Sequence, residues 1–296
     1  GYLETVVPLA KGTSWAESLE LNGAVRATDY SQSGFVATWK VGVVYQPIPD
    51  IRFRATKSRD IRAPNLNEYF AGGTSNTNTV LDRFNNSLPV SYQGFNQGNA
   101  ALTPEKADAI GLGVVVQPAF LEGFSASVDY FDVKIKDAIG TVNAQTIVDY
   151  CFQGNTDFCA AITRGPNSTG TQVIQRIRIQ PFNLALQQIK GFDLEASYRF
   201  DLADMMDNWA GAVTIRGSAS RALKDIQDNT VNPVEERAGA ENPKWRYSAQ
   251  INYNLHPFTA TLAARGRSRG KFDDDWIECT TGCPVSNVTN ITINQN

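Results

Sequence analysis

The sequence predicts an all-β fold, an antiparallel transmembrane β-barrel, from three observations. Apolar and polar side chains alternate along many segments, which gives each segment one apolar and one polar face. Most of these segments reach the roughly 9 to 11 residues that a tilted strand needs to cross a bilayer. Short and long connections between them take turns, as in barrels of the outer membrane.

Ten segments carry the alternating pattern. The clearest is 245–254, where aromatic and aliphatic residues such as Trp245 and Ile251 alternate with polar ones such as Arg246 and Gln250. We therefore predict strands at about 2–8, 17–28, 35–45, 50–60, 105–116, 122–136, 191–200, 210–221, 245–254 and 257–269.

The segment 122–136 departs from simple alternation. Its apolar series ends at Tyr130 and resumes on the other face at Phe131. Two explanations fit this change of face: a β-bulge near Tyr130, or a strand that projects above the bilayer, where the rule for the two faces no longer holds.

The connections differ in length in a regular way. Short ones lie near 46–50, 117–122, 201–209 and 255–257, and long ones lie at 61–103, 137–188, 222–243 and 270–296. Apart from the brief 29–34, short and long connections alternate, so nearly all long loops fall at one end of a single segment, 1–296. A β-sandwich has no physical reason for this asymmetry, whereas tight periplasmic turns and long extracellular loops are typical of a transmembrane barrel.

The charges exclude a general affinity for nucleic acid. Lys and Arg number 27 against 30 Asp and Glu, so the cations between 51 and 62 form a local run in a chain of net charge −3. On a barrel strand these side chains would face a wet lumen and pair there with acids on other strands. We predict lumen-facing charges at Arg52, Arg54, Glu195 and Arg246.

Four stretches together resemble the barrel of a TonB-dependent outer-membrane receptor. They are "IRFRATKSRDIRAPNLNEYF" (51–70), "ALTPEKADAIGLGVVV" (101–116), "FSASVDYFDVKIKDAIG" (124–140) and "IKGFDLEASYRF" (189–200). The resemblance covers essentially the whole chain. It implies a 22-stranded barrel closed by an N-terminal plug, of which these are about ten strands.

The same resemblance implies a function and a location. Receptors of this family lie in the outer membrane of Gram-negative bacteria and import scarce nutrients such as ferric siderophores, cobalamin or oligosaccharides. The TonB complex supplies energy through the plug, which we expect to lie outside this sequence. Further expected partners are the small-molecule or oligosaccharide ligand, the lipid of the outer membrane and a surface lipoprotein; no cofactor is implied.

Candidate ligand contacts lie in two loops. Arg62, Asn65, Glu68 and Tyr69 follow the fourth predicted strand, and Asp273, Asp274, Asp275 and Trp276 lie in the last loop. The acidic run would also suit calcium, but it lacks the alternating ligands of a calcium loop. No nucleophile elbow, phosphate loop or histidine metal motif is found, so we predict a binding protein rather than an enzyme.

The four cysteines form two close pairs. Cys151 with Cys159 and Cys279 with Cys283 predict two local disulfides and an oxidising compartment. A zinc site is the alternative, although its usual ligand spacing is missing. We expect the first pair, between the possibly helical stretches "AQTIVDY" and "CAAITR", to fix a small knob that covers or shapes the extracellular mouth.

Two other protein classes remain open at this stage. A structural or adhesive surface barrel would share the strand pattern but would show no energy-dependent uptake. A soluble extracellular β-sandwich, such as a carbohydrate-binding module, would share the alternation but not the uneven loops.

Overall fold

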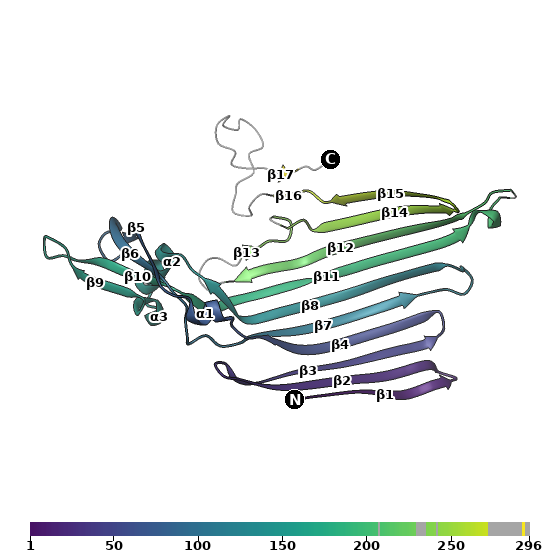
Figure 1. Ribbon diagram of the computed structural model, residues 1–296, viewed down its shortest axis with the longest axis horizontal. Coiled ribbons are helices and arrows are strands. Elements are labelled where there is room, and N and C mark those ends of the chain that lie inside the picture. Colours follow the sequence, from purple (N-terminus) through teal and green to yellow (C-terminus); the bar gives the residue numbers. More distant parts are fainter. Residues whose placement is uncertain (207, 229–234, 241, 272–291, 294–296) are drawn as a thin grey trace.

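The structure is a computed structural model that describes residues 1–206, 208–228, 235–240, 242–271 and 292–293. Its main feature is an 11-stranded sheet whose strands pair in chain order (Figure 1). The strands on this path are β1 (Tyr2–Thr13), β2 (Ala16–Tyr30), β3 (Gly34–Ile48), β4 (Ile51–Arg62), β7 (Glu105–Val116), β8 (Phe124–Thr141), β11 (Pro181–Asp201), β12 (Ala212–Asp228), β14 (Trp245–Leu255) and β15 (Phe258–Arg267). All ten predicted segments are therefore confirmed as strands.

Each of these strands is antiparallel to its neighbours, and we call this part of the sheet the wall. Three short elements lie beside it: β13 (Glu235–Glu236) pairs with β12, a 3-10 turn covers Leu202–Asp204, and β16 (Gly270–Lys271) pairs with β17 (Thr292–Ile293). Most strands run beyond their predicted ends; β11, for example, begins at Pro181, not near 191. No helix in the described part of the chain has the length and apolar character needed to cross a membrane.

The wall has two chemically different faces, because successive side chains of a strand point to opposite sides. On one face, Ala55 of β4 lies opposite Leu112 of β7, which lies opposite Tyr130 of β8. This face is apolar yet exposed: Leu112 is 50% exposed and Leu262 of β15 is 71% exposed. The other face carries the polar partners in the alternation.

The predicted bulge near Tyr130 is wrong. The pairing of β8 with β7 runs without a shift from Ala126 to Lys136, and its pairing with β11 is regular through the same region. Side chains therefore keep their faces, and the series Val128, Tyr130, Asp132, Lys134 stays on one side. The polarity of that side changes, not the register, as the second explanation requires.

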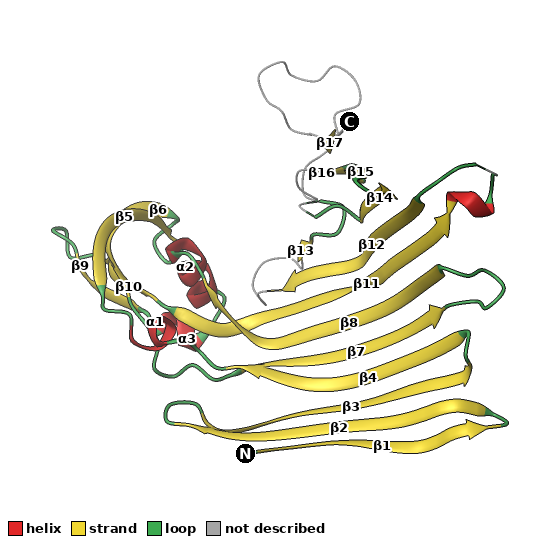
Figure 2. Cartoon of the chain, turned by 45° about the vertical axis from the view of Figure 1, so that its right-hand side comes forward, coloured by secondary structure: helices red, strands yellow, loops and turns green. Residues whose placement is uncertain are grey.

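The long connections after β4 and β8 fold together into one unit beside one end of the wall (Figure 2). The first contributes β5 (Thr74–Asp82) and β6 (Leu88–Asn96); the second contributes α2 (Ala144–Phe152), α3 (Thr156–Cys159), β9 (Ile162–Pro166) and β10 (Gln172–Ile179). β10 pairs in parallel with β6, which joins both connections in a four-stranded sheet of order β5-β6-β10-β9. We call residues 74–96 and 142–179 the knob.

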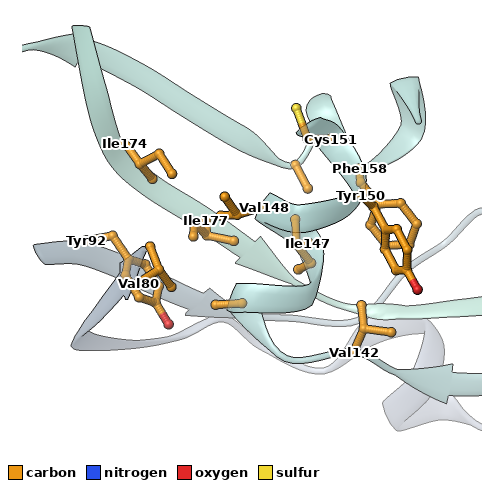
Figure 3. Close-up of a cluster of buried hydrophobic side chains, with 12 residues drawn as sticks. Val80, Tyr92, Val142, Ile147, Val148, Tyr150, Cys151, Phe158, Ile174 and Ile177 are labelled. Atoms are coloured by element: carbon orange, nitrogen blue, oxygen red, sulfur yellow. The ribbon is translucent and has the colours of Figure 1, made fainter. Parts of the chain in front are cut away.

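The knob has a hydrophobic core of its own (Figure 3). Ile147 of α2, Phe158 of α3 and Ile174 of β10 are almost completely buried. A disulfide between Cys151 and Cys159 connects the two helices. The local knob, the first disulfide and the first helical stretch are thus confirmed, whereas "CAAITR" leads into β9 and is not helical.

Candidate functional site

The sequence-predicted cluster after β4 forms one connected set of side chains around α1 (Leu66–Phe70). Asn65 caps this helix: its Oδ1 accepts from the backbone N–H of Glu68 at 2.9 Å, and its own N–H donates to the Glu68 carboxylate at 2.7 Å. This reciprocal capping box is the arrangement that the Asn-x-x-Glu spacing favours. Pro64, just before the cap, is compatible with the extended chain that leads into it.

Arg62 lies between two carboxylates. Its guanidinium donates to Glu68 at 3.0 Å and to Glu105, the first residue of β7, at 2.6 Å. Partial burial of Glu68 raises its pKa, but the hydrogen bonds from Arg62 and from the Asn65 N–H outweigh this, so the pKa lies below its ordinary value. Arg62 thus ties the end of β4 to α1 and β7, and its charge is largely neutralised.

Tyr69 is 5% exposed and connects α1 to two other segments. Its hydroxyl lies 2.6 Å from the Ser33 hydroxyl, in the β2–β3 connection, and 3.3 Å from the Leu102 carbonyl oxygen. The four candidate residues Arg62, Asn65, Glu68 and Tyr69 are therefore brought together, and their polar groups are engaged within the protein. Their contact with a ligand stays a prediction.

The polar face of the wall carries a row of charged residues. Arg54 of β4 donates to Asp129 of β8 at 2.7 Å, reaching across β7 above Gly113. A Cβ on Gly113 would lie 2.0 Å from Asp129 Oδ1 and 2.7 Å from Arg54 Nε. Glycine is required here for the approach of the two side chains. The row continues through Asp193 and Ser220 to Arg246, in register.

The other predicted charges lie on this same face. Arg52 donates to Gln46 at 3.3 Å, and Glu195 lies with Arg54 in a cleft of about 710 Å³. The cleft is lined chiefly by hydroxyl, carboxylate and guanidinium groups: Arg54, Ser125, Ser127, Glu195, Arg216 and Ser218. Such a surface can hydrogen-bond a large polar or anionic molecule. Within the described residues, no group of three or more His, Cys, Asp or Glu side chains is placed to hold a metal ion.

The surface of the knob presents an aromatic patch that sequence reasoning missed. Phe84 and Phe152 meet edge to face with ring centroids 5.1 Å apart, and both rings are about half exposed. The Arg164 guanidinium lies 4.7 Å from the Phe84 ring centroid and pairs with the fully buried Asp82. These residues come from three segments far apart in the chain, so no local motif could have indicated the patch.

A second ion pair fixes the same surface. Arg83 donates to the Asp149 carboxylate of α2 at 2.7 Å. Partial burial raises the pKa of Asp149, but hydrogen bonds from Arg83 and Gln145 lower it further, so its pKa is below the ordinary value. The remaining candidates, Asp273 to Asp275, Trp276, Cys279 and Cys283, lie outside the described residues.

Comparison with known proteins gives one family and one group of folds. The family model for "TonB dependent receptor-like, beta-barrel" matches residues 2–285. No curated protein matches the sequence.

Among solved structures, the siderophore receptor PirA from Acinetobacter baumannii superposes with a TM-score of 0.61 at 18% identity, over 91% of this chain and 33% of that one. A mutant of the ferric enterobactin receptor PfeA from Pseudomonas aeruginosa, in complex with enterobactin, gives 0.59 at 11% identity, again over 91% and 33%. PirA from Pseudomonas aeruginosa gives 0.51 at 14% identity, over 91% and 40%. The chain spans about a third of the length of the first two receptors, and at these identities the likeness shows the fold.

Proposed function

Because the chain belongs to the TonB-dependent receptor-like β-barrel family, we propose that it forms part of an outer-membrane receptor of a Gram-negative bacterium that binds a scarce nutrient for active import. In this proposal the wall spans the bilayer, with its apolar face toward lipid and its polar face toward the lumen. TonB supplies energy through a plug outside this sequence, and the short turns of the wall lie on the periplasmic side.

The single observation that carries the proposal is the opposite character of the two faces. Large apolar side chains such as Phe53, Ile251 and Leu262 are between 44% and 71% exposed, which in water would be costly over so wide a surface. Facing hydrocarbon, the same side chains are favourable. The polar face, with Arg54, Glu195 and their neighbours, would meanwhile stay hydrated.

Within the nutrients that the family imports, a ferric siderophore has the best support. The similar solved structures carry the names of siderophore and ferric enterobactin receptors. Guanidinium groups on the polar face, from Arg54, Arg216 and Arg246, suit an acidic or oxygen-rich ligand. Cobalamin and oligosaccharides remain the alternatives, and a surface lipoprotein that passes on the ligand remains a possible partner.

We assign the first contact with the ligand to the loops. The candidates are the Arg62–Tyr69 cluster, the aromatic patch of the knob and, in the last loop, Asp273 to Asp275 with Trp276. Arg62 would have to exchange one of its two carboxylate partners for the ligand, whereas Phe84 and Phe152 are already exposed.

Uptake of iron-55 complexed by a panel of siderophores tests this function. A strain lacking the receptor gene is complemented with the natural full-length gene, in cells with and without TonB. We expect accumulation of one or a few ferric siderophores that disappears without TonB. Binding without TonB-dependent accumulation would instead favour a structural or adhesive barrel.

A pair of variants on β12 refines the test. Arg216 lines the polar cleft, whereas Arg221 lies on the opposite face, against Trp245. We expect Arg216→Gln to weaken ligand binding about tenfold, as the loss of a charge-assisted hydrogen bond does, and Arg221→Gln to leave it unchanged. Equal effects of the two changes would contradict the lumen assignment.

A further inference from the structure

We propose that the lipid-facing side of the wall carries a binding site for the phosphate groups of anionic outer-leaflet lipids. The site is a belt of charged residues on β4, β7, β8, β11 and β12. The inference rests on the proposed function for the location of the wall in the outer membrane. We call this set the cationic belt: Lys57, Arg59, Asp108, Asp132, Lys134, Lys136, Lys190 and Lys224.

The strand register places the belt on the apolar face. On β4, Lys57 and Arg59 follow Phe53 and Ala55 at intervals of two residues, so all four share a side. Because β8 has no bulge near Tyr130, Lys134 shares a side with Val128 and Tyr130 in the same way. These cations therefore face away from the polar cleft.

The change from apolar to charged occurs on neighbouring strands at matching positions. Lys57 pairs across β7, at Ile110, with Asp132 of β8, and Asp132 pairs with Lys190 of β11. The last apolar side chains before the change on β8 and β11 are the rings of Tyr130 and Phe192, 5.3 Å apart. Aromatic rings favour the membrane interface, so the belt begins where lipid headgroups would lie.

The belt has more positive charge than its own carboxylates neutralise. Asp108 accepts from Arg59 at 2.7 Å and lies 3.9 Å from Lys136; Asp132 lies 3.2 Å from Lys190. Among the residues that the structure describes, no ion pair is formed by Lys57, Lys134 or Lys224. The two carboxylates hold some cations in place, and these three lysines remain for an external anion.

The dimensions suit a headgroup that carries more than one phosphate. Adjacent strands are about 4.8 Å apart, so Lys57 and Lys134, on strands separated by β7, are roughly 10 Å apart across the sheet. A cationic surface beside a bilayer attracts anionic lipids and weakens in affinity as salt screens the charges. A lipid anchored by its chains against the apolar face would bring its phosphates to this height.

The test measures lipid binding to the natural full-length receptor in an uncharged detergent. The probe is bis-phosphorylated lipid A in mixed micelles, and the control probe is the same lipid after enzymatic removal of its phosphates. Wild type is compared with Lys57→Gln/Lys134→Gln, which breaks no ion pair. The matched control is Lys40→Gln on β3: Lys40 pairs with Ser58, one residue along from Lys57, and thus lies on the polar face.

We expect the double variant to bind the phosphorylated lipid at least twentyfold more weakly, at about fivefold per cation. Lys40→Gln should bind like the wild type, and the dephosphorylated lipid should bind weakly to every protein. The proposal is overturned if the double variant binds normally, if Lys40→Gln loses as much, or if phosphate removal changes nothing.

Two further readouts separate related explanations. Inorganic phosphate should not displace the lipid at matched ionic strength; displacement would mean a free-phosphate site and would overturn the lipid assignment. Because lipid binding is measured without TonB or siderophore, failure of siderophore uptake leaves its result intact. Conversely, loss of lipid binding in the double variant with normal uptake would support the belt independently of the imported substrate.

Discussion

The wall and the knob are stabilised in opposite ways. The wall is held by long backbone ladders and leaves its large apolar side chains exposed, as at Phe258, which is 59% exposed. The knob buries its apolar side chains inside itself, as at Phe158, which is 1% exposed. The wall therefore depends on an apolar medium around it, whereas the knob has a core of the kind found in water-soluble proteins. One chain thus combines two folding environments, and changes can be chosen that affect only one of them.

The largest expected effect separates the two regions with two phenylalanines. Phe158→Ala removes a buried ring and should destabilise the knob by about 3 to 5 kcal/mol, so that added protease cuts within 142–179 on intact cells. Phe258→Ala, on the exposed face of the wall, should leave the knob resistant. The heat-modifiable gel mobility of the barrel should be the same in both variants; a mobility change with Phe158→Ala would show that the regions are coupled.

The disulfide should give a smaller effect, again confined to the knob. Cys151 and Cys159 are 8 residues apart, and closing so short a loop stabilises by about 2.5 kcal/mol in the chain-entropy estimate. Replacing both with Ser should raise the rate of proteolysis in the knob without changing urea unfolding of the wall. Unchanged proteolysis would contradict the idea that this bond maintains the knob.

Acid should loosen the knob through Asp149. Its pKa in the folded protein is lowered, so its stabilising contribution is present above the unfolded pKa of about 3.9 and is lost as the pH falls through the folded value. We expect protease sensitivity of the knob to rise below about pH 4. Arg83→Gln removes the partner and should flatten this dependence; an unaltered pH profile in that variant would exclude Asp149 as its source.

The smallest expected effect is in the wall. Gly113→Ala should push apart Arg54 and Asp129, but both side chains are partly exposed, at 50% and 28%, and exposed ion pairs contribute about 0 to 1 kcal/mol. Urea unfolding in detergent should therefore shift little, while binding at the polar cleft changes. Gly140→Ala on β8, where a Cβ would meet nothing within 4 Å, is the control.

The same contrast explains what the sequence could predict. Alternation is a local signal, so the strands of the wall could be found from residues such as Trp245 and Ile251. The parallel pairing of Arg176 with Gln93 connects two loops far apart in the chain and has no local signal. The change of face at Tyr130 was assigned to a bulge because a single strand cannot distinguish a register shift from a change in surroundings; the pairing with its neighbours can.

The site was partly predictable for a similar reason. The Asn65–Glu68 spacing is a local capping motif, and the glycine at 113 indicated room for a neighbouring side chain, which Arg54 and Asp129 occupy. The second carboxylate partner of Arg62, Glu105, and the contact between Phe84 and Phe152 depend on segments that meet only in the fold.

The most direct test of the account is the accessibility of two adjacent residues of β8 in intact outer membranes. Ser127 lines the polar cleft, and Val128 lies on the apolar face, 38% exposed. With the full-length receptor, a small membrane-impermeant maleimide should label Ser127→Cys and leave Val128→Cys at the background of the wild type. Equal labelling of the two positions would contradict a wall that separates lipid from a wet lumen.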